Sequence, residues 1–170
     1  LEGDNTGVEL SFKESVSVND ATEIEIYVEN IHQLGAYELA LAFDHQNIEV
    51  LSIESGSFIE KGNRETMELQ NSIDSKNGLI QYALASLGSS ANGAIGSGSI
   101  LKIRYQAKEN TSQPFELIAG QLARIDAKVI DFKLKTNVQD LEDVNDEETF
   151  IVSTRPNPFS EEMLIKYQVG

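Results

Sequence analysis

Apolar and polar residues alternate at every second position along much of this chain of 170 residues. A period of two puts successive side chains on opposite faces of a β-strand, so each alternating segment predicts a strand with one buried face. The clearest segments are 23–29, 36–43, 80–85, 101–107 and 130–135. No comparably long segment shows the period of a helix. The sequence therefore predicts an all-β fold of short antiparallel strands, arranged as a two-sheet sandwich.

Turn-forming residues separate these segments. The stretches "VND", "SKNG" and "KENTSQP" predict turns, and His32 and His45 are expected to lie in turns as well. The stretch Gly88 to Ser99 is rich in glycine and serine and predicts a loop. Its glycines are spaced as in a phosphate-binding loop, but no Lys-Ser or Lys-Thr follows and no strand–loop–helix pattern surrounds it. We therefore assign it no phosphate site.

The composition excludes several classes of partner and chemistry. The net charge is −15, which repels the phosphate backbone of nucleic acids. The sequence has no cysteine, which excludes disulfides, thiolate metal sites and cysteine nucleophiles. No run of 18 apolar residues occurs, so we expect no membrane insertion. Oligomeric state is left open by these features.

The sequence predicts no catalytic or metal site, no cofactor and no enzymatic activity. His32 and His45 are the two histidines, and they are far apart in sequence and have no convergent ligands. The acidic stretch 140–148 lacks the glycine that a calcium-binding loop needs at its sixth position. No serine lies in a strand–turn–helix context that would expose it as a nucleophile.

The character of the chain changes near residue 138. We expect a β-sandwich domain over residues 1–137 and an acidic linker over 138–149. Residues 150–170 then predict one trailing strand, which is either an extra strand of the main domain or the start of a second domain.

One strand surface is unusual for an acidic protein. In the segment 36–43, Tyr37, Leu39, Leu41 and Phe43 share the face that a core would bury. The opposite face carries Ala36, Glu38, Ala40 and Ala42, and the outward positions of a second strand are Gln81, Ala83, Ala85 and Leu87. Small residues on an outward face let another protein approach closely, so this face predicts a docking surface. Two alternatives remain open: the C-terminal segment covers the face, or the alanines have no role.

Five segments in order resemble a cohesin domain, the bacterial module that holds dockerin-bearing proteins. They are "VELSFKESVSVNDATEIEIYVENI", "AYELALAFDHQNIEVLSIESGSF", "GLIQYALASLG", "GSGSILKIRYQAK" and "LARIDAKVI". The resemblance covers about Val8 to Lys135. It implies a nine-stranded jelly-roll sandwich in which the outer face of one sheet binds a helix of a dockerin-type module, which can be calcium-loaded. One class of cohesins carries Asn and Asp where this chain has Ala36 and Glu38.

Pattern and resemblance together give one set of candidate protein-binding residues, in which Ala123 comes from the resemblance. Glu38, Gln81 and Ser86 are expected to donate or accept hydrogen bonds that set the partner's register. The full set is Ala36, Glu38, Ala40, Ala42, Gln81, Ala83, Ala85, Ser86, Leu87, Gly88 and Ala123. The alternative functions are a carbohydrate-binding or adhesive sandwich that uses the outward-facing Tyr27, and a structural spacer of a surface protein.

The tail has a resemblance of its own. The segment "RPNPFSEEMLIKYQV" resembles the opening of the C-terminal sorting domain of the type IX secretion route. This implies an exported protein, extracellular or attached to the cell surface, whose chain continues beyond Gly170.

Overall fold

The computed structural model describes residues 5–18, 21–61, 64–87, 92–109 and 111–135. All regular elements in these residues are strands, which confirms the all-β prediction. The predicted linker and trailing strand, 138–149 and 150–170, lie outside the described residues, as does Gly88. The nine strands are β1 (Glu9–Val18), β2 (Ala21–Phe43), β3 (Ile48–Ser55), β4 (Thr66–Asp74), β5 (Leu79–Ser86), β6 (Ala94–Ala107), β7 (Phe115–Arg124), β8 (Val129–Ile130) and β9 (Lys133–Lys135).

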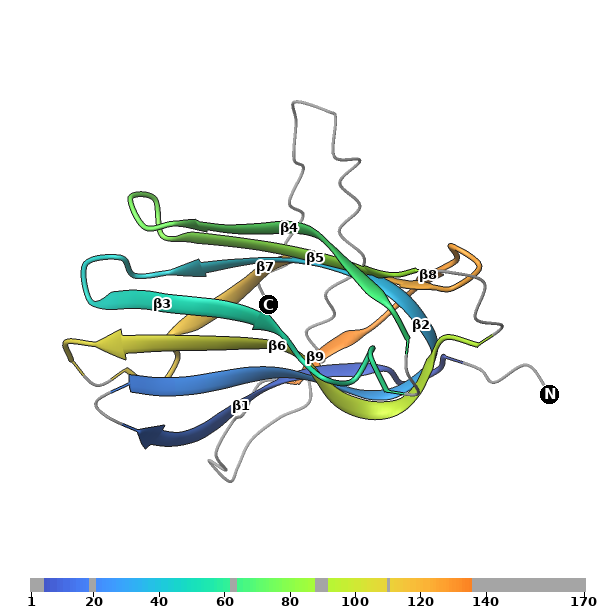
Figure 1. The fold of residues 1–170 in the computed structure, drawn as a ribbon. Helices are drawn as coiled ribbons and strands as arrows, with labels where there is room; N and C mark the ends of the chain where they lie inside the picture. Colours follow the sequence, from blue (N-terminus) through green and yellow to red (C-terminus); the bar gives the residue numbers. More distant parts are fainter. Residues whose placement is uncertain (1–4, 19–20, 62–63, 88–91, 110, 136–170) are drawn as a thin grey trace, which may run out of the picture. The chain divides into compact units, whose positions relative to one another are not determined.

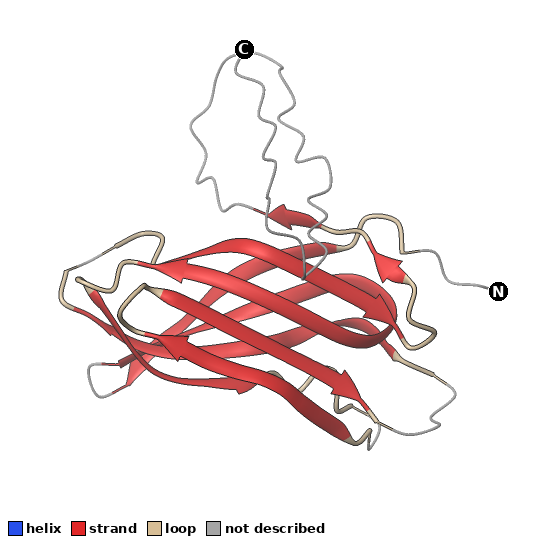
Figure 2. Cartoon of the chain, turned by 90° about the horizontal axis from the view of Figure 1, so that it is seen from above, coloured by secondary structure: helices blue, strands red, loops and turns tan. Residues whose placement is uncertain are grey.

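Strand β2 is long enough to belong to two sheets. Its first part pairs with β1 and β6, and its second part pairs with β5 and β7. Sheet 1 therefore has the order β3–β6–β2–β1–β9, and sheet 2 has the order β4–β5–β2–β7–β8 (Figure 1). Every pairing is antiparallel except that of β1 with β9. The two sheets form the layers of a jelly-roll sandwich, whose strands overlie one another in Figure 2.

The transfer of β2 between sheets occurs at a bend around His32. Asn30 and Gln33 have positive φ angles of 59° and 67°, which turn the strand. The side chain of Asn5 holds the bend, because it accepts a hydrogen bond from the His32 amide (2.7 Å) and donates one to the His32 carbonyl (3.0 Å). The prediction that His32 lies in a turn is therefore wrong, since pairing with β6 and β7 continues up to and past the bend.

Two further expectations need correction. The predicted loop at 88–99 is in part a strand, because β6 begins at Ala94. The predicted strand 130–135 is two strands, because Ile130 pairs with β7 in sheet 2 whereas Lys133 begins β9 in sheet 1. The chain changes sheets between them, and a uniform alternation of residue types does not reveal such a change.

The core lies between the inward faces of the two sheets. Leu39 and Leu41 from β2 and Ile80 from β5 are completely buried there. Tyr37 stacks on Tyr82 with ring centroids 6.1 Å apart, and its hydroxyl donates a hydrogen bond to the Ile100 carbonyl of the other sheet. Burial raises the pKa of Tyr37, so the hydroxyl keeps its proton and remains a donor.

The predicted "SKNG" turn is confirmed between β4 and β5. A carboxylate oxygen of Asp74 accepts hydrogen bonds from the amides of Lys76 and Asn77, both at 3.1 Å. Gly78 has a φ of 66°, and a Cβ atom there would lie 2.2 Å from the Phe43 carbonyl oxygen. The turn therefore requires glycine, and it fixes β4 and β5 beside the end of β2.

Candidate docking surface

The outer face of sheet 2 has a floor of alanines at its centre. Strand β2 lies between β5 and β7, so each outward residue of β2 has a neighbour on both sides. Ala36 lies opposite Ala85 and Ala123, and Ala40 lies opposite Gln81 and Ala119. Side chains this small leave the face flat, because no Cβ substituent rises above the backbone.

Most of the residues predicted from sequence lie together on this face. Glu38 lies opposite Ala83 on one side and Gln121 on the other, and Ala42 completes the outward positions of β2. Leu87 follows the end of β5 and has the same parity as Ala85. The predicted residues found on or next to the face are Ala36, Glu38, Ala40, Ala42, Gln81, Ala83, Ala85, Leu87 and Ala123.

Ser86 is the exception. It lies opposite Thr66 and has the inward parity of Leu84, which is buried. Its hydroxyl oxygen is buried and has no hydrogen-bond partner among the described residues. This placement removes Ser86 from the outer face, so the expectation that it sets the partner's register by hydrogen bonding is wrong for this geometry.

Large apolar side chains surround the alanine floor. Of the large apolar side chains that are exposed in the described residues, most lie on sheet 2 or directly after one of its strands, with exposed fractions from 39% to 60%. Met67 lies opposite Ala85 on β4, and Val129 lies opposite Ala123 on β8. The whole group is Met67, Leu69, Leu87, Ile118 and Val129. An exposed apolar group of this extent is typical of an interaction surface.

Two of these side chains are exposed because of β-bulges. The pairing of β4 with β5 shifts between Glu68 and Gln70, which leaves Leu69 as the extra residue. The pairing of β7 with β2 shifts around Ile118 in the same way. A bulge adds one residue to a strand and redirects its side chain, so both leucine and isoleucine reach solvent here. Sequence reasoning missed Met67, Leu69, Ile118, Ala119 and Val129.

The outer face of sheet 1 has a different chemistry. Glu25 forms an ion pair with Lys102 at 3.3 Å. Glu29 pairs with Lys13 at 3.6 Å and with Lys135 at 3.3 Å. The hydrogen bond and charge of Lys135 hold the pKa of Glu29 below its ordinary value. The chain itself therefore neutralises both of these glutamates on the outer face of sheet 1.

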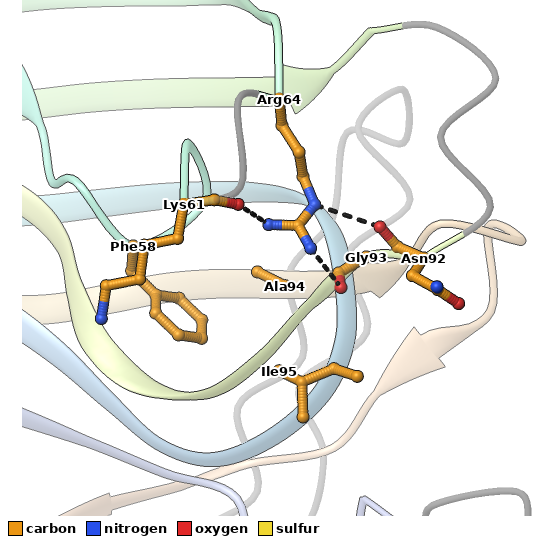
Figure 3. Close-up of a pocket in the computed structure, with 7 residues that line it drawn as sticks. All are labelled: Phe58, Lys61, Arg64, Asn92, Gly93, Ala94 and Ile95. Atoms are coloured by element: carbon orange, nitrogen blue, oxygen red, sulfur yellow. Dashed lines mark hydrogen bonds between the residues drawn. The ribbon is translucent and has the colours of Figure 1, made fainter.

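A hollow of about 340 Å³ lies between the β3–β4 connection and the start of β6, where Phe58, Ala94 and Ile95 line it (Figure 3). Arg64 also lines the hollow, and its guanidinium is hydrogen-bonded to backbone carbonyls. It donates to the carbonyl of Lys61 and, at 3.0 Å each, to the carbonyls of Asn92 and Gly93. The hollow is thus a place where Arg64 ties two connections together, and no acid–base pair faces it in the described residues.

The described residues contain no group of three histidine, cysteine or acidic side chains placed to hold a metal ion. His32 lies at the bend of β2 and His45 lies in the turn after it, far from one another along the strand. Nor does any described helix have the length and apolar character needed to cross a bilayer. The feature left to explain is the outer face of sheet 2.

Comparisons with known proteins identify the family. No curated protein matches the chain. Solved structures with the same fold include the second type II cohesin module of the ScaA adaptor scaffoldin from Acetivibrio cellulolyticus, with a TM-score of 0.63, 7% identity, and coverage of 82% of this chain and 92% of that chain. A type I cohesin–dockerin complex from Clostridium thermocellum has a TM-score of 0.59 and 20% identity, and the match covers 76% of this chain and 89% of that chain. A non-cellulosomal cohesin from the archaeon Archaeoglobus fulgidus has a TM-score of 0.54 and 14% identity, and the match covers 76% of this chain and 86% of that chain.

Identities this low show a shared fold and no more. The family model is stronger evidence, because the model described as the cohesin domain matches residues 8–127, which is more than half of the chain. The match includes β1 to β7 and therefore both β5 and the whole of β2. This chain belongs to the cohesin domain family.

Proposed function

We propose that this chain is a non-catalytic recognition module that docks a dockerin-type helical partner on the outer face of sheet 2. The observation that carries the proposal is the ring of exposed apolar side chains around a flat alanine floor. In a chain with a net charge of −15, such a face is costly to leave in water. A partner that covers it would gain the apolar burial without displacing any charged cluster.

The dimensions of the floor suit a helix. Neighbouring strands lie about 4.8 Å apart, so the distance from β5 across β2 to β7 is roughly 10 Å. A helix with its side chains is about 10–12 Å in diameter. Met67 on β4 and Val129 on β8 would then lie along the two sides of the helix, and the alanines would let its backbone approach closely.

The family supports the identity of the partner. Cohesins are non-catalytic recognition modules, and the Clostridium thermocellum structure named above contains a dockerin bound to its cohesin. Cohesins are typical of extracellular assemblies, which supports an exported protein here. The resemblance of the tail to a type IX sorting domain supports placement at the cell surface, although those residues lie outside the described chain.

A single substitution tests the docking face. Ala40→Arg places a long charged side chain in the middle of the floor, and we expect it to weaken binding of any dockerin partner by about 100-fold or more. Isothermal titration with purified, calcium-loaded dockerin modules measures the affinity, and thermal unfolding checks that the variant remains folded. Gln106→Arg, an exposed position on β6 in sheet 1, is the matched control and should bind as the parent does. Equal binding by Ala40→Arg would refute the proposed face.

A second variant addresses the possibility that the chain's own tail occupies the face. Replacing Leu164 and Ile165 by serine in the full chain removes the apolar side chains that such a covering segment would use. We expect dockerin affinity to stay unchanged. A gain of tenfold or more would mean that the tail competes for the face.

Carbohydrate binding is less well supported. A sugar platform needs an open aromatic ring, but the ammonium of Lys13 lies 3.2 Å from the centre of the Tyr27 ring. That cation–π contact covers one face of the one outward tyrosine that the sequence offered for this role. Binding on a glycan array that disappears in Tyr27→Ala would reverse this ranking.

A further inference from the structure

We infer that the partner helix carries a lysine or arginine whose charge is neutralised by Glu38 at the centre of the docking face. This inference rests on the proposed function, because it describes the chemistry of the partner at that same face. It specifies a helix whose apolar surface carries one central cation, and it argues against a second copy of this chain as the occupant.

Glu38 is placed where a docked helix must cover it. It projects from the central strand, between Ala83 on β5 and Gln121 on β7. Its side chain is exposed, and it forms no ion pair or hydrogen bond with any described residue. Gln81 on β5 accepts a hydrogen bond from Gln70 at 3.1 Å, and no hydrogen bond joins its own amide group to Glu38 in the described residues. Glu38 is therefore a carboxylate without an ion-pair partner among the described residues, at the centre of the alanine floor.

Three carboxylates on the strands of sheet 1 are neutralised within the chain. Glu25 and Glu29 have lysine partners on sheet 1, and Lys135 also lies 2.8 Å from Glu9. The strand segments of sheet 2 contain a single cationic residue, Arg124, which pairs with Asp126 at 3.1 Å. No cation within those segments is thus left for Glu38.

Docking would change the surroundings of this charge. A helix on the floor removes water from Glu38, and an unpaired carboxylate loses far more solvation than neutral contacts return. A lysine or arginine on the helix restores the interaction in a desolvated setting, where an ion pair with good geometry contributes to both affinity and orientation.

The same charge argues against self-association through this face. A two-fold symmetric contact would bring Glu38 and Glu116 of one copy toward the same two carboxylates of the other. The chain has 28 acidic and 13 basic residues, so two copies also repel at longer range. A basic helix from another protein has neither difficulty.

The experiment selects helices without assuming their sequence. A displayed three-helix-bundle library, randomised on the surface of two helices, is panned against the full chain. The same selection is run on Glu38→Gln, on Glu38→Lys, and on Glu49→Lys, a control at an exposed position of β3 with the same change in net charge as Glu38→Lys. Selected binders are then tested against Ala40→Arg to establish which of them use the docking face.

We expect face-directed binders from the parent to be enriched in lysine or arginine at one central position. Their affinity should fall about tenfold or more on Glu38→Gln and further on Glu38→Lys, and change less than about twofold on Glu49→Lys. Exchanging that binder lysine for glutamate should restore binding to Glu38→Lys.

Two other results would overturn the inference, and they are distinguishable. Binders that are lost on Ala40→Arg but are indifferent to Glu38 would leave the docking face intact and show that its partner needs no cation. Binders that are indifferent to both substitutions would show that the face is not a docking surface, so the proposed function would fail as well.

Discussion

The two outer faces of the sandwich share one strand and have opposite chemistry. The first part of β2 presents Glu25 and Glu29 on sheet 1, where lysines neutralise them. The second part presents Ala36 and Ala40 on sheet 2, beside exposed methionine, leucine, isoleucine and valine side chains. The inward positions of both parts are equally apolar and buried. The contrast is therefore confined to the outward positions of the strand.

This contrast separates stability from recognition along a single strand. Adjacent residues of β2 point in opposite directions, so inward residues contribute to folding and outward residues are free to serve binding. Leu39 and Ala40 illustrate the difference: Leu39 is completely buried, while Ala40, the next residue along the strand, lies on the alanine floor.

The largest effect should come from an inward substitution. Leu39→Ala removes a completely buried side chain from the core and should lower the free energy of unfolding by about 2–5 kcal/mol. Ala40→Arg, one residue further, should change it by less than about 1 kcal/mol because its side chain extends into solvent. Urea denaturation followed by circular dichroism measures both. A larger loss of stability for Ala40→Arg than for Leu39→Ala would mean that the two faces of β2 are not separated in this way.

Much of this division could be predicted from the sequence. Alternation placed Tyr37, Leu39 and Leu41 inside because burial selects apolar residues at every second position, and it placed the alanines of the same strand outside. Parity alone would also have placed Ser86 inward with Leu84, so its inclusion in the site went against the alternation.

The rest of the face depends on events that alternation does not record. The bulges that expose Leu69 and Ile118 add one residue to a strand, and nothing in the local sequence marks where the extra residue enters. Val129 lies on the face because β8 pairs it with the outward Ala123 of β7. Tertiary pairing determines each of these positions, so the apolar rim became visible only in the structure.

An intermediate effect is expected at Arg64, a cation used differently from those of sheet 1. Its guanidinium binds backbone carbonyls on both sides of the hollow instead of a carboxylate. Arg64→Ala should lower the free energy of unfolding by about 1–2 kcal/mol, because the carbonyls lose a charged donor that joins two connections. Arg64→Lys keeps the charge but lacks the planar fork, and it should recover less than half of the loss. Chemical denaturation measures both variants, and full stability in Arg64→Lys would mean that charge alone explains the residue.

The smallest effect concerns the charged face and tests whether its ion pairs contribute measurably. Lys135 lowers the pKa of Glu29 below its ordinary value of 4.5. A carboxylate whose pKa is lowered by folding contributes stability that is fully present above the ordinary value and is lost as the pH falls through the lowered one. Glu29→Gln removes this titration, so the melting temperature of the variant should decline less steeply than that of the parent on acidification below about pH 4.5.

Lys135→Gln should make the decline in melting temperature at acid pH less steep in the same way, since it removes the partner that lowers the pKa of Glu29. The effect should be small because water screens an exposed pair. Parallel acid limbs in all three proteins would show that the ion pairs of sheet 1 neutralise the face without stabilising the fold, and the two faces would then differ in solubility and recognition alone.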